Sequence, residues 1–152
     1  MPEHTFSRTE LLIGKENLNK LKNSTVVVFG IGGVGSFATE SLCRAGIGNL
    51  ILIDNDTVSI SNLNRQIIAT LNTIDKPKVE VMKERILSIN PECNVVCHET
   101  FVEESNIKDL IPANADYVID AIDTVSSKIS LVMWCNENNI PIISSMGTGN
   151  KL

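Results

Sequence analysis

The chain has 152 residues, of which 43% are hydrophobic and 20% charged, values that predict one globular domain with a buried core. Its formal net charge of −5 gives no overall sign of nucleic-acid or membrane binding. The four cysteines form no C-x-x-C pair, the N-terminus lacks an apolar signal segment, and the longest uncharged stretch, residues 23–39, is too polar for a membrane span. We therefore expect reduced cysteines and a cytoplasmic protein.

The first predicted helix begins at Ser7, where S-R-T-E matches a capping box. By spacing alone, Arg8 is most simply a solvated charge on this helix. Four leucines form an apolar side that we expect to pack on the outside of a sheet or on a partner: Leu11, Leu12, Leu18 and Leu21.

The stretch V-V-V-F-G-I-G-G-V-G, residues 26–35, predicts a strand over residues 25–29 that runs into a loop. A helix is predicted over residues 36–45, closed by Gly46. A glycine-rich loop before a helix N-terminus lets backbone N–H groups approach an anion, so a phosphate is the natural ligand. The loop satisfies G-x-G-x-x-G and contains Gly30, Gly32, Gly33 and Gly35.

Phe37, Leu42 and Ala45 are the predicted core positions of this helix. The second strand, residues 50–53, ends in the sequence D-N-D. Its first carboxylate, Asp54, falls where a doubly wound sheet places an acid on a ribose hydroxyl. The alternative is that Asp54 is only a turn aspartate.

Residues 55–73 are irregular and rich in Asn and Ser, and a loop of this length inside a domain is usually functional. The loop contains S-N-L-N-R-Q, residues 61–66. A helix opens at D-K-P-K, with Pro77 in its first turn, and Asn90-Pro91 ends it. Its apolar positions recur at helical spacing: Val79, Met82, Ile86 and Ile89.

The remaining elements continue the alternation of strands and helices. We predict strands over residues 94–97, 117–119 and 140–144, helices over residues 107–111 and 124–137, and a second glycine turn over residues 147–149. The core side of the last helix is predicted to carry Ile129, Val132 and Met133. This order predicts an α/β fold: a Rossmann-like, mainly parallel sheet with helices on both faces.

Taken alone, the glycine motif indicates a nicotinamide or flavin dinucleotide. Two features favour a triphosphate instead. Arg65 and Lys78 lie on the segment that crosses the carboxyl edge of the sheet, and a triphosphate needs such side-chain cations. Asp123 follows the fourth strand at the same edge, and a carboxylate near polyphosphate implies a bridging Mg²⁺. Asp120 is the rival for that role, unless it only ends the strand.

Six motifs along the chain, G-I-G-G-V-G-S, D-N-D, S-N-L-N-R-Q, K-P-K, I-N-P and D-A-I-D-T, together resemble the ThiF/MoeB/HesA family of adenylating enzymes, relatives of the ubiquitin-activating enzymes. The resemblance runs from about residue 6 to residue 152. Four longer matches are most similar to the tRNA threonylcarbamoyladenosine dehydratase branch of that family: R-T-E-L-L-I-G, I-N-P-E-C, V-I-D-A-I-D-T-V and I-P-I-I-S-S-M-G-T-G-N-K-L.

The resemblance implies that the chain binds ATP with Mg²⁺ and activates a carboxylate as an acyl adenylate, releasing pyrophosphate. It gives catalytic roles to Arg8, Arg65, Lys78 and Asp123, with Asp123 as the Mg²⁺ ligand. Arg8 would enter the site of a neighbouring subunit, which implies a homodimer. The implied nucleotide site comprises Gly30, Gly32, Gly33, Gly35, Asp54, Asp56, Asn62, Arg65, Gln66, Lys78 and Asp123.

For the dehydratase branch, the implied substrate is the threonylcarbamoyl carboxylate on a tRNA adenosine, which cyclises with loss of water and needs no enzyme cysteine. The alternative substrate within the family is the C-terminus of a ubiquitin-like sulfur-carrier protein, with a sulfur-carrier or cysteine-desulfurase system as partner. A third possibility is a nucleotide-binding fragment without turnover, and a fourth is a dinucleotide oxidoreductase. No membrane partner is expected.

Two features depart from the family pattern. Asp75 stands where the family usually has glycine, a position from which it would cap the following helix and bring a negative charge near Lys78. Members of this branch also run to about twice the size of a single domain. We therefore expect residues 1–152 to be the N-terminal, ATP-binding part of a larger family domain, with much of the substrate surface in an absent C-terminal half.

Overall fold

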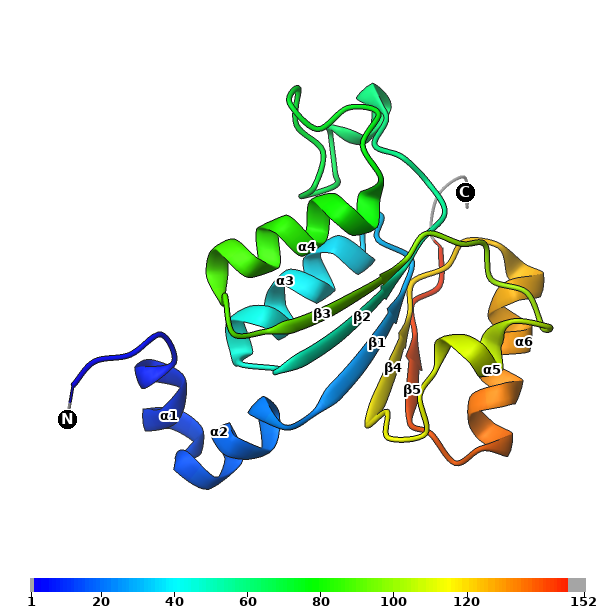
Figure 1. The fold of residues 1–152 in the computed structure, drawn as a ribbon. Coiled ribbons are helices and arrows are strands. Elements are labelled where there is room, and N and C mark those ends of the chain that lie inside the picture. Colours follow the sequence, from blue (N-terminus) through cyan, green and yellow to red (C-terminus); the bar gives the residue numbers. More distant parts are fainter. Residues whose placement is uncertain (1, 148–152) are drawn as a thin grey trace.

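A five-stranded sheet forms the centre of the protein in a computed structural model, which describes residues 2–147 (Figure 1). The strand order is β3-β2-β1-β4-β5, and every neighbouring pair is parallel. The Rossmann-like α/β prediction is therefore confirmed. The strands are β1 (Thr25–Phe29), β2 (Asn49–Ile53), β3 (Asn94–His98), β4 (Tyr117–Asp120) and β5 (Ile142–Ser144).

Helices cover both faces of the sheet (Figure 1). Val26 and Val28 of β1 belong to the apolar core on one face, while Val27 and Phe29 belong to the core on the other. Because both faces are covered, β1 is buried along its whole length and reads as a continuous apolar run. One face packs on α3 (Gly35–Ala45) and α4 (Lys78–Ile89), and the other on α5 (Ile107–Leu110) and α6 (Val125–Glu137).

Two short helices, α1 (Ser7–Ile13) and α2 (Lys15–Lys22), precede the amino end of β1 (Figure 1). Their predicted apolar side is only partly correct, since Leu18 is buried but Leu11 and Leu12 are 88% and 85% exposed. The capping box does not form either: Ser7 is already helical, and its hydroxyl accepts from the His4 N–H. Within residues 2–147, no helix is both long and apolar enough to cross a membrane.

The predicted core faces of α3 and α6 are wrong in part. Phe37 is 49% exposed, and Ile129 and Met133 are 54% and 57% exposed. The faces that pack on the sheet include small or polar residues, whose hydroxyl and ammonium groups find hydrogen-bond partners when buried. On α3 these are Ser36 and Thr39, and on α6 they are Ser127 and Lys128.

The segment between β2 and α4 carries a short 3₁₀ helix, η1 (Ile60–Asn62), and rises above the carboxyl edge of the sheet (Figure 1). The predicted apolar positions of α4 are confirmed, with Val79, Met82 and Ile86 fully buried. Asp75 does not cap α4. Its φ is 68°, in the left-handed region that glycine adopts most easily, which explains why glycine suits this position.

A buried carboxylate joins α3 to α4. Glu40 accepts hydrogen bonds from Arg85 on α4 and from Arg44 one turn later on α3. Hydrogen bonding to Arg85 is the largest cause of a lowered Glu40 pKa, which outweighs the opposite effect of burial. This ion pair does not line the cavity at the carboxyl ends of the strands.

Candidate nucleotide-binding site

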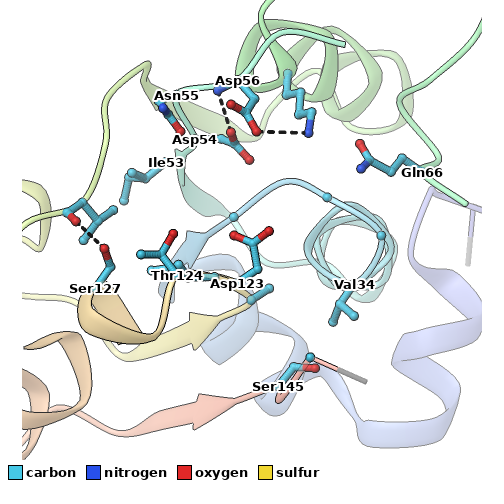
Figure 2. A pocket seen from close by; sticks show the side chains of 18 of the residues that line it. Val34, Ile53, Asp54, Asn55, Asp56, Gln66, Asp123, Thr124, Ser127 and Ser145 are labelled. Carbon is cyan, nitrogen blue, oxygen red and sulfur yellow. Dashed lines mark hydrogen bonds and ion pairs between the residues drawn. The ribbon is translucent and has the colours of Figure 1, made fainter. Parts of the chain in front are cut away.

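A cavity of about 610 Å³ lies at the carboxyl ends of β1, β2 and β4 (Figure 2). Chain order along the sheet reverses between β1 and β4, which is where open parallel sheets bind their ligands. The volume is within the range of small-molecule sites. All predicted site residues except Arg8 and Gly35 line it: Gly30, Gly32, Gly33, Asp54, Asp56, Asn62, Arg65, Gln66, Lys78 and Asp123.

Two glycines close the glycine-rich loop through backbone contact. Gly30 has a φ of 91°, and a Cβ there would lie 2.6 Å from the Ala121 carbonyl oxygen. A Cβ on Gly35 would overlap the Gly30 carbonyl oxygen. Gly35 therefore shapes the loop without lining the cavity, and both positions exclude larger residues for reasons of packing.

The other two glycines of the loop face the cavity. The nearest atom to a Cβ on Gly32 would be Gln66 Nε2 at 3.6 Å, and the nearest to one on Gly33 would be Cγ of Arg65 at 3.6 Å. These are ordinary contact distances, so the fold does not need glycine at either position. A ligand that approaches the backbone closely would need it.

Asp54 ties the glycine loop to the turn after β2. Its Oδ2 accepts from the Ile31 N–H at 2.7 Å, and its Oδ1 accepts from the Asp56 N–H at 2.8 Å. Asp54 therefore does act as a turn aspartate, as one of the two interpretations predicted. Each carboxylate oxygen has a second lone pair, and Asp54 lines the cavity, so a ribose hydroxyl could still donate to it.

A polar, cationic end of the cavity is built from the segment between β2 and α4. The Lys78 side chain is only 7% exposed, and its ammonium lies 3.7 Å from Asp56 Oδ2. Its charge partner is therefore Asp56, where the sequence suggested Asp75. Arg65 is exposed, and its guanidinium donates to the Ser61 carbonyl at 3.1 Å and to Asn64 at 2.9 Å.

Asn62 and Gln66 contribute amides to the same end. Asn62 uses its carbonyl oxygen to accept from the Ser59 N–H at 2.8 Å, so it also holds the η1 turn. Gln66 is buried, and among the described residues its Oε1 has no hydrogen-bond partner. A buried unpaired amide oxygen beside a cavity is a group that a ligand or water would satisfy.

The two candidate metal ligands after β4 have different environments. Asp120 is fully buried and accepts from Lys128 Nζ at 2.7 Å and from the Ile122 N–H at 3.1 Å. Asp123 points into the cavity and makes no side-chain hydrogen bond or ion pair with any residue between 2 and 147 (Figure 2). Of the two, Asp123 is therefore the carboxylate available to a ligand. Thr124 precedes α6 but forms no side-chain cap.

Apolar side chains also line the cavity, and sequence reasoning did not predict them. They include Ile53, Phe101, Val102 and Ile122, and Figure 2 shows Ile53 on a different side of the cavity from Gln66. Phe101 and Val102 come from the loop after β3, which carries no recognisable motif. The only signal for them was position, because a loop after a parallel strand next to β2 must lie near this edge.

Arg8 lies at the other side of the sheet from the cavity. It is exposed on α1, which leads through α2 to the amino end of β1, whereas the cavity lies at the carboxyl ends of the strands (Figure 1). The structure therefore does not bring Arg8 together with the other predicted residues of its own chain.

The cysteines offer no activated thiolate. Burial raises the pKa of Cys93, Cys97 and Cys135 to about 11. Burial is also the largest cause of a raised pKa at Cys43. At neutral pH these thiols stay protonated, and a protonated thiol is a poor nucleophile.

A parallel sheet with a glycine loop, cationic side chains and apolar side chains around a cavity at its reversal point defines an α/β protein with a candidate nucleotide-binding site. The ThiF family matches residues 6–151, and the chain belongs to this family.

The relatives include the tRNA threonylcarbamoyladenosine dehydratase of Bacillus subtilis, 53% identical over 148 residues. The sulfur carrier protein ThiS adenylyltransferase of Escherichia coli is 36% identical over 151 residues. The crystal structure of E. coli TcdA, the tRNA threonylcarbamoyladenosine dehydratase, in complex with ATP superposes with a TM-score of 0.94 at 42% identity, and the same enzyme has been solved with AMP.

The chain spans only part of these proteins. The B. subtilis match covers 97% of this chain and 58% of the relative, and the ThiS adenylyltransferase match covers 97% and 60%. The match to the ATP complex of TcdA covers 97% of this chain and 61% of the crystallised one.

Proposed function

We propose that the chain binds ATP with Mg²⁺ and provides the nucleotide site of an ATP-dependent adenylating enzyme that activates a carboxylate. The observation that carries the proposal is that one cavity combines apolar side chains, two cationic side chains and a loop whose packing does not require glycine at Gly32 and Gly33. An adenine base suits the apolar side chains, and phosphates suit Lys78 and Arg65. The relatives solved with ATP and AMP support the same ligand.

The proposed reaction is attack of a carboxylate oxygen on the α-phosphorus of ATP, with cleavage of its bond to the oxygen that bridges to the β-phosphate. Charge then develops on the departing pyrophosphate. Lys78 and Arg65, which line the cavity, would stabilise that charge, while Asp54 would hold the ribose. The backbone at Gly32 and Gly33 would approach the phosphates.

The charge balance of the cavity supports a requirement for Mg²⁺. Its lining has three carboxylates, Asp54, Asp56 and Asp123, against two cations, Arg65 and Lys78. A polyphosphate would meet excess negative charge unless a divalent cation came with it. Among residues 2–147 no cluster of three or more His, Cys, Asp or Glu forms a metal site, so Asp123 and the phosphates would together supply the ligands.

The carboxylate we favour is that of the threonylcarbamoyl group on a tRNA adenosine, because the dehydratase of B. subtilis is 53% identical while the ThiS adenylyltransferase is 36% identical. After adenylation, the carbamoyl nitrogen or oxygen would close on the activated carbonyl and expel AMP, so that the substrate loses water overall. The raised thiol pKa values fit a route that needs no enzyme cysteine.

Calorimetric titration of the chain with ATP and MgCl₂, and separately with NAD, tests the nucleotide. We expect binding of ATP·Mg, no comparable binding of NAD, and a weaker response to Mg²⁺ in Asp123→Ala. Tighter binding of NAD would contradict the proposal.

Pyrophosphate exchange into ATP that depends on threonylcarbamoyl-modified tRNA would identify the favoured substrate. Exchange that depends on a sulfur-carrier protein ending in Gly-Gly would identify the alternative, and ATP binding with no AMP formed would indicate a binding fragment.

We also propose that the active form is a homodimer in which Arg8 enters the cavity of the partner. Arg8 sits at the edge of the sheet opposite its own cavity, and the exposed Leu11 and Leu12 beside it are suited to an interface. Arg8→Ala should weaken ATP·Mg binding only under conditions where the protein is dimeric by analytical ultracentrifugation. Lys15→Ala, on the neighbouring helix, is the matched control. A dimer that binds ATP·Mg equally well with and without Arg8 would contradict the role.

A further inference from the structure

Three loops of the cavity wall converge on the first turn of α6. They follow β3, β4 and β5, and among their cavity-lining residues are Phe101, Asp123 and Met146. Each loop leaves a different strand, so none of them determines the position of the others. Their relative placement depends on side chains that bridge from one loop to the next.

Lys128 provides such a bridge. Its ammonium donates to Asp120 Oδ2 at 2.7 Å and to the Ser145 carbonyl at 2.9 Å. Asp120 Oδ1 accepts from the Ile122 N–H at 3.1 Å, and the Asp120 carbonyl accepts from the Ser145 N–H at 2.8 Å. The backbone is therefore fixed at Ile122, one residue before Asp123.

The neighbouring residue of α6 holds the third loop. Ser127 is buried and its hydroxyl donates to the Val102 carbonyl at 2.7 Å (Figure 2). Two successive side chains in one helical turn thus connect all three loops, and both act on backbone groups that the sheet leaves free at its carboxyl edge.

Stability alone is a weak explanation for the pair of Lys128 and Asp120. Lys128 is 8% exposed and Asp120 is fully buried. Removing two charges from water offsets most of their attraction, and apolar residues of similar size often replace such pairs without loss of stability. A pair that fixes backbone geometry beside a functional carboxylate has a positional role that apolar residues could not take over.

We propose that Asp120 and Lys128 are positioning residues that hold the Asp123 carboxylate where it meets the metal ion of a bound nucleotide. This inference rests on the proposed function, because it assumes that nucleotide and Mg²⁺ bind in the cavity. The carboxylate of Asp123 itself is exposed, so its direction depends on the backbone that carries it.

The test replaces the pair by apolar residues of similar size, Asp120→Leu with Lys128→Met. The matched control is Glu40→Leu with Arg85→Met, which removes the partly buried ion pair between α3 and α4, away from the cavity. The first measurement is the ratio of ATP dissociation constants in EDTA and in MgCl₂. The second is amide hydrogen exchange at Ile122 in the free protein, which needs neither nucleotide nor metal.

We expect the Mg²⁺-dependent gain in ATP affinity to fall by about tenfold in the cavity variant, within the usual range of coupling between sites, while ATP affinity in EDTA changes little. Exchange at Ile122 should quicken by about tenfold, the effect of losing one hydrogen bond. The control should change neither quantity. In an Asp123→Ala background, replacing the pair should have no further effect on the Mg²⁺ response.

Two results would overturn the inference: an unchanged Mg²⁺ response in the folded cavity variant, or effects that add fully to those of Asp123→Ala. If the apolar variant does not fold, the same measurements are made on the amide pair Asp120→Asn with Lys128→Gln. This variant keeps the hydrogen bonds in a weaker, neutral form and so preserves the fold. The Mg²⁺ response must then fall by about threefold, and an unchanged response overturns the inference. If the parent protein binds no ATP·Mg, it is the proposed function that fails, and exchange at Ile122 still reports on the pair.

Discussion

Replacing Lys78 by methionine should lower the affinity for ATP·Mg by about 10- to 100-fold, as expected for removal of a hydrogen bond to a charged group. The Lys78 ammonium lies at the cationic end of the cavity, and its aliphatic stem is buried in the first turn of α4. Methionine keeps the packing of the stem and removes only the charge. Asp56, the present partner of Lys78, is 64% exposed and stays solvated without it.

Isothermal titration with ATP, ADP and AMP measures this effect, which should grow with the number of phosphates. The control is Lys76→Met, two residues earlier, where an exposed lysine does not line the cavity. That variant should bind all three nucleotides like the parent. If Lys78→Met binds ATP and AMP with the parent's affinities, the phosphates do not occupy this end of the cavity.

Gly35→Ala should destabilise the fold by about 3 kcal/mol or more, in the range of severe backbone or packing conflicts. A Cβ on Gly35 would overlap the Gly30 carbonyl oxygen, and both partners are backbone in the loop that joins β1 to α3. Neither can move without opening the loop. Nucleotide binding should be lost together with stability, because the loop forms one wall of the cavity.

Gly33→Ala is the matched control for Gly35→Ala. Its added methyl would meet only the flexible side chain of Arg65, so the midpoint of chemical denaturation should stay close to that of the parent. Its nucleotide affinity should nevertheless fall, since the methyl occupies space that the phosphates would use. If Gly35→Ala unfolds at the parent's denaturant concentration, the loop is not closed by contact between Gly30 and Gly35.

The sequence predicted the order of elements well because two local signals agreed. The apolar run of β1 is continuous since helices cover both faces of the sheet, and glycine and proline mark where elements stop. Gly46, for example, closes α3 as predicted, and it does so in a left-handed conformation. Each predicted strand lies within two residues of an observed one.

Helix faces were harder to predict. Hydropathy assigned Phe37, Ile129 and Met133 to the core, yet the buried positions of the same helices include Thr39 and Lys128. A polar side chain can be buried when a specific hydrogen-bond partner is available to it, and that partner can come from a distant part of the chain. Lys128, for instance, donates a hydrogen bond to the carbonyl of Ser145, which follows β5. Local periodicity carries no information about such partners.

The amino-acid sequence was enough to predict the family, the sheet and most of the predicted site residues that line the cavity, because motifs at strand ends necessarily meet at one edge of a parallel sheet. The environment of each of those residues became clear from the folded structure. It engaged Asp120 with Lys128 and left Asp123 in the cavity, it paired Lys78 with Asp56, and it placed Arg8 at the opposite edge. These outcomes depend on side-chain partners that are remote in the chain, and such partners exist only once the chain has folded.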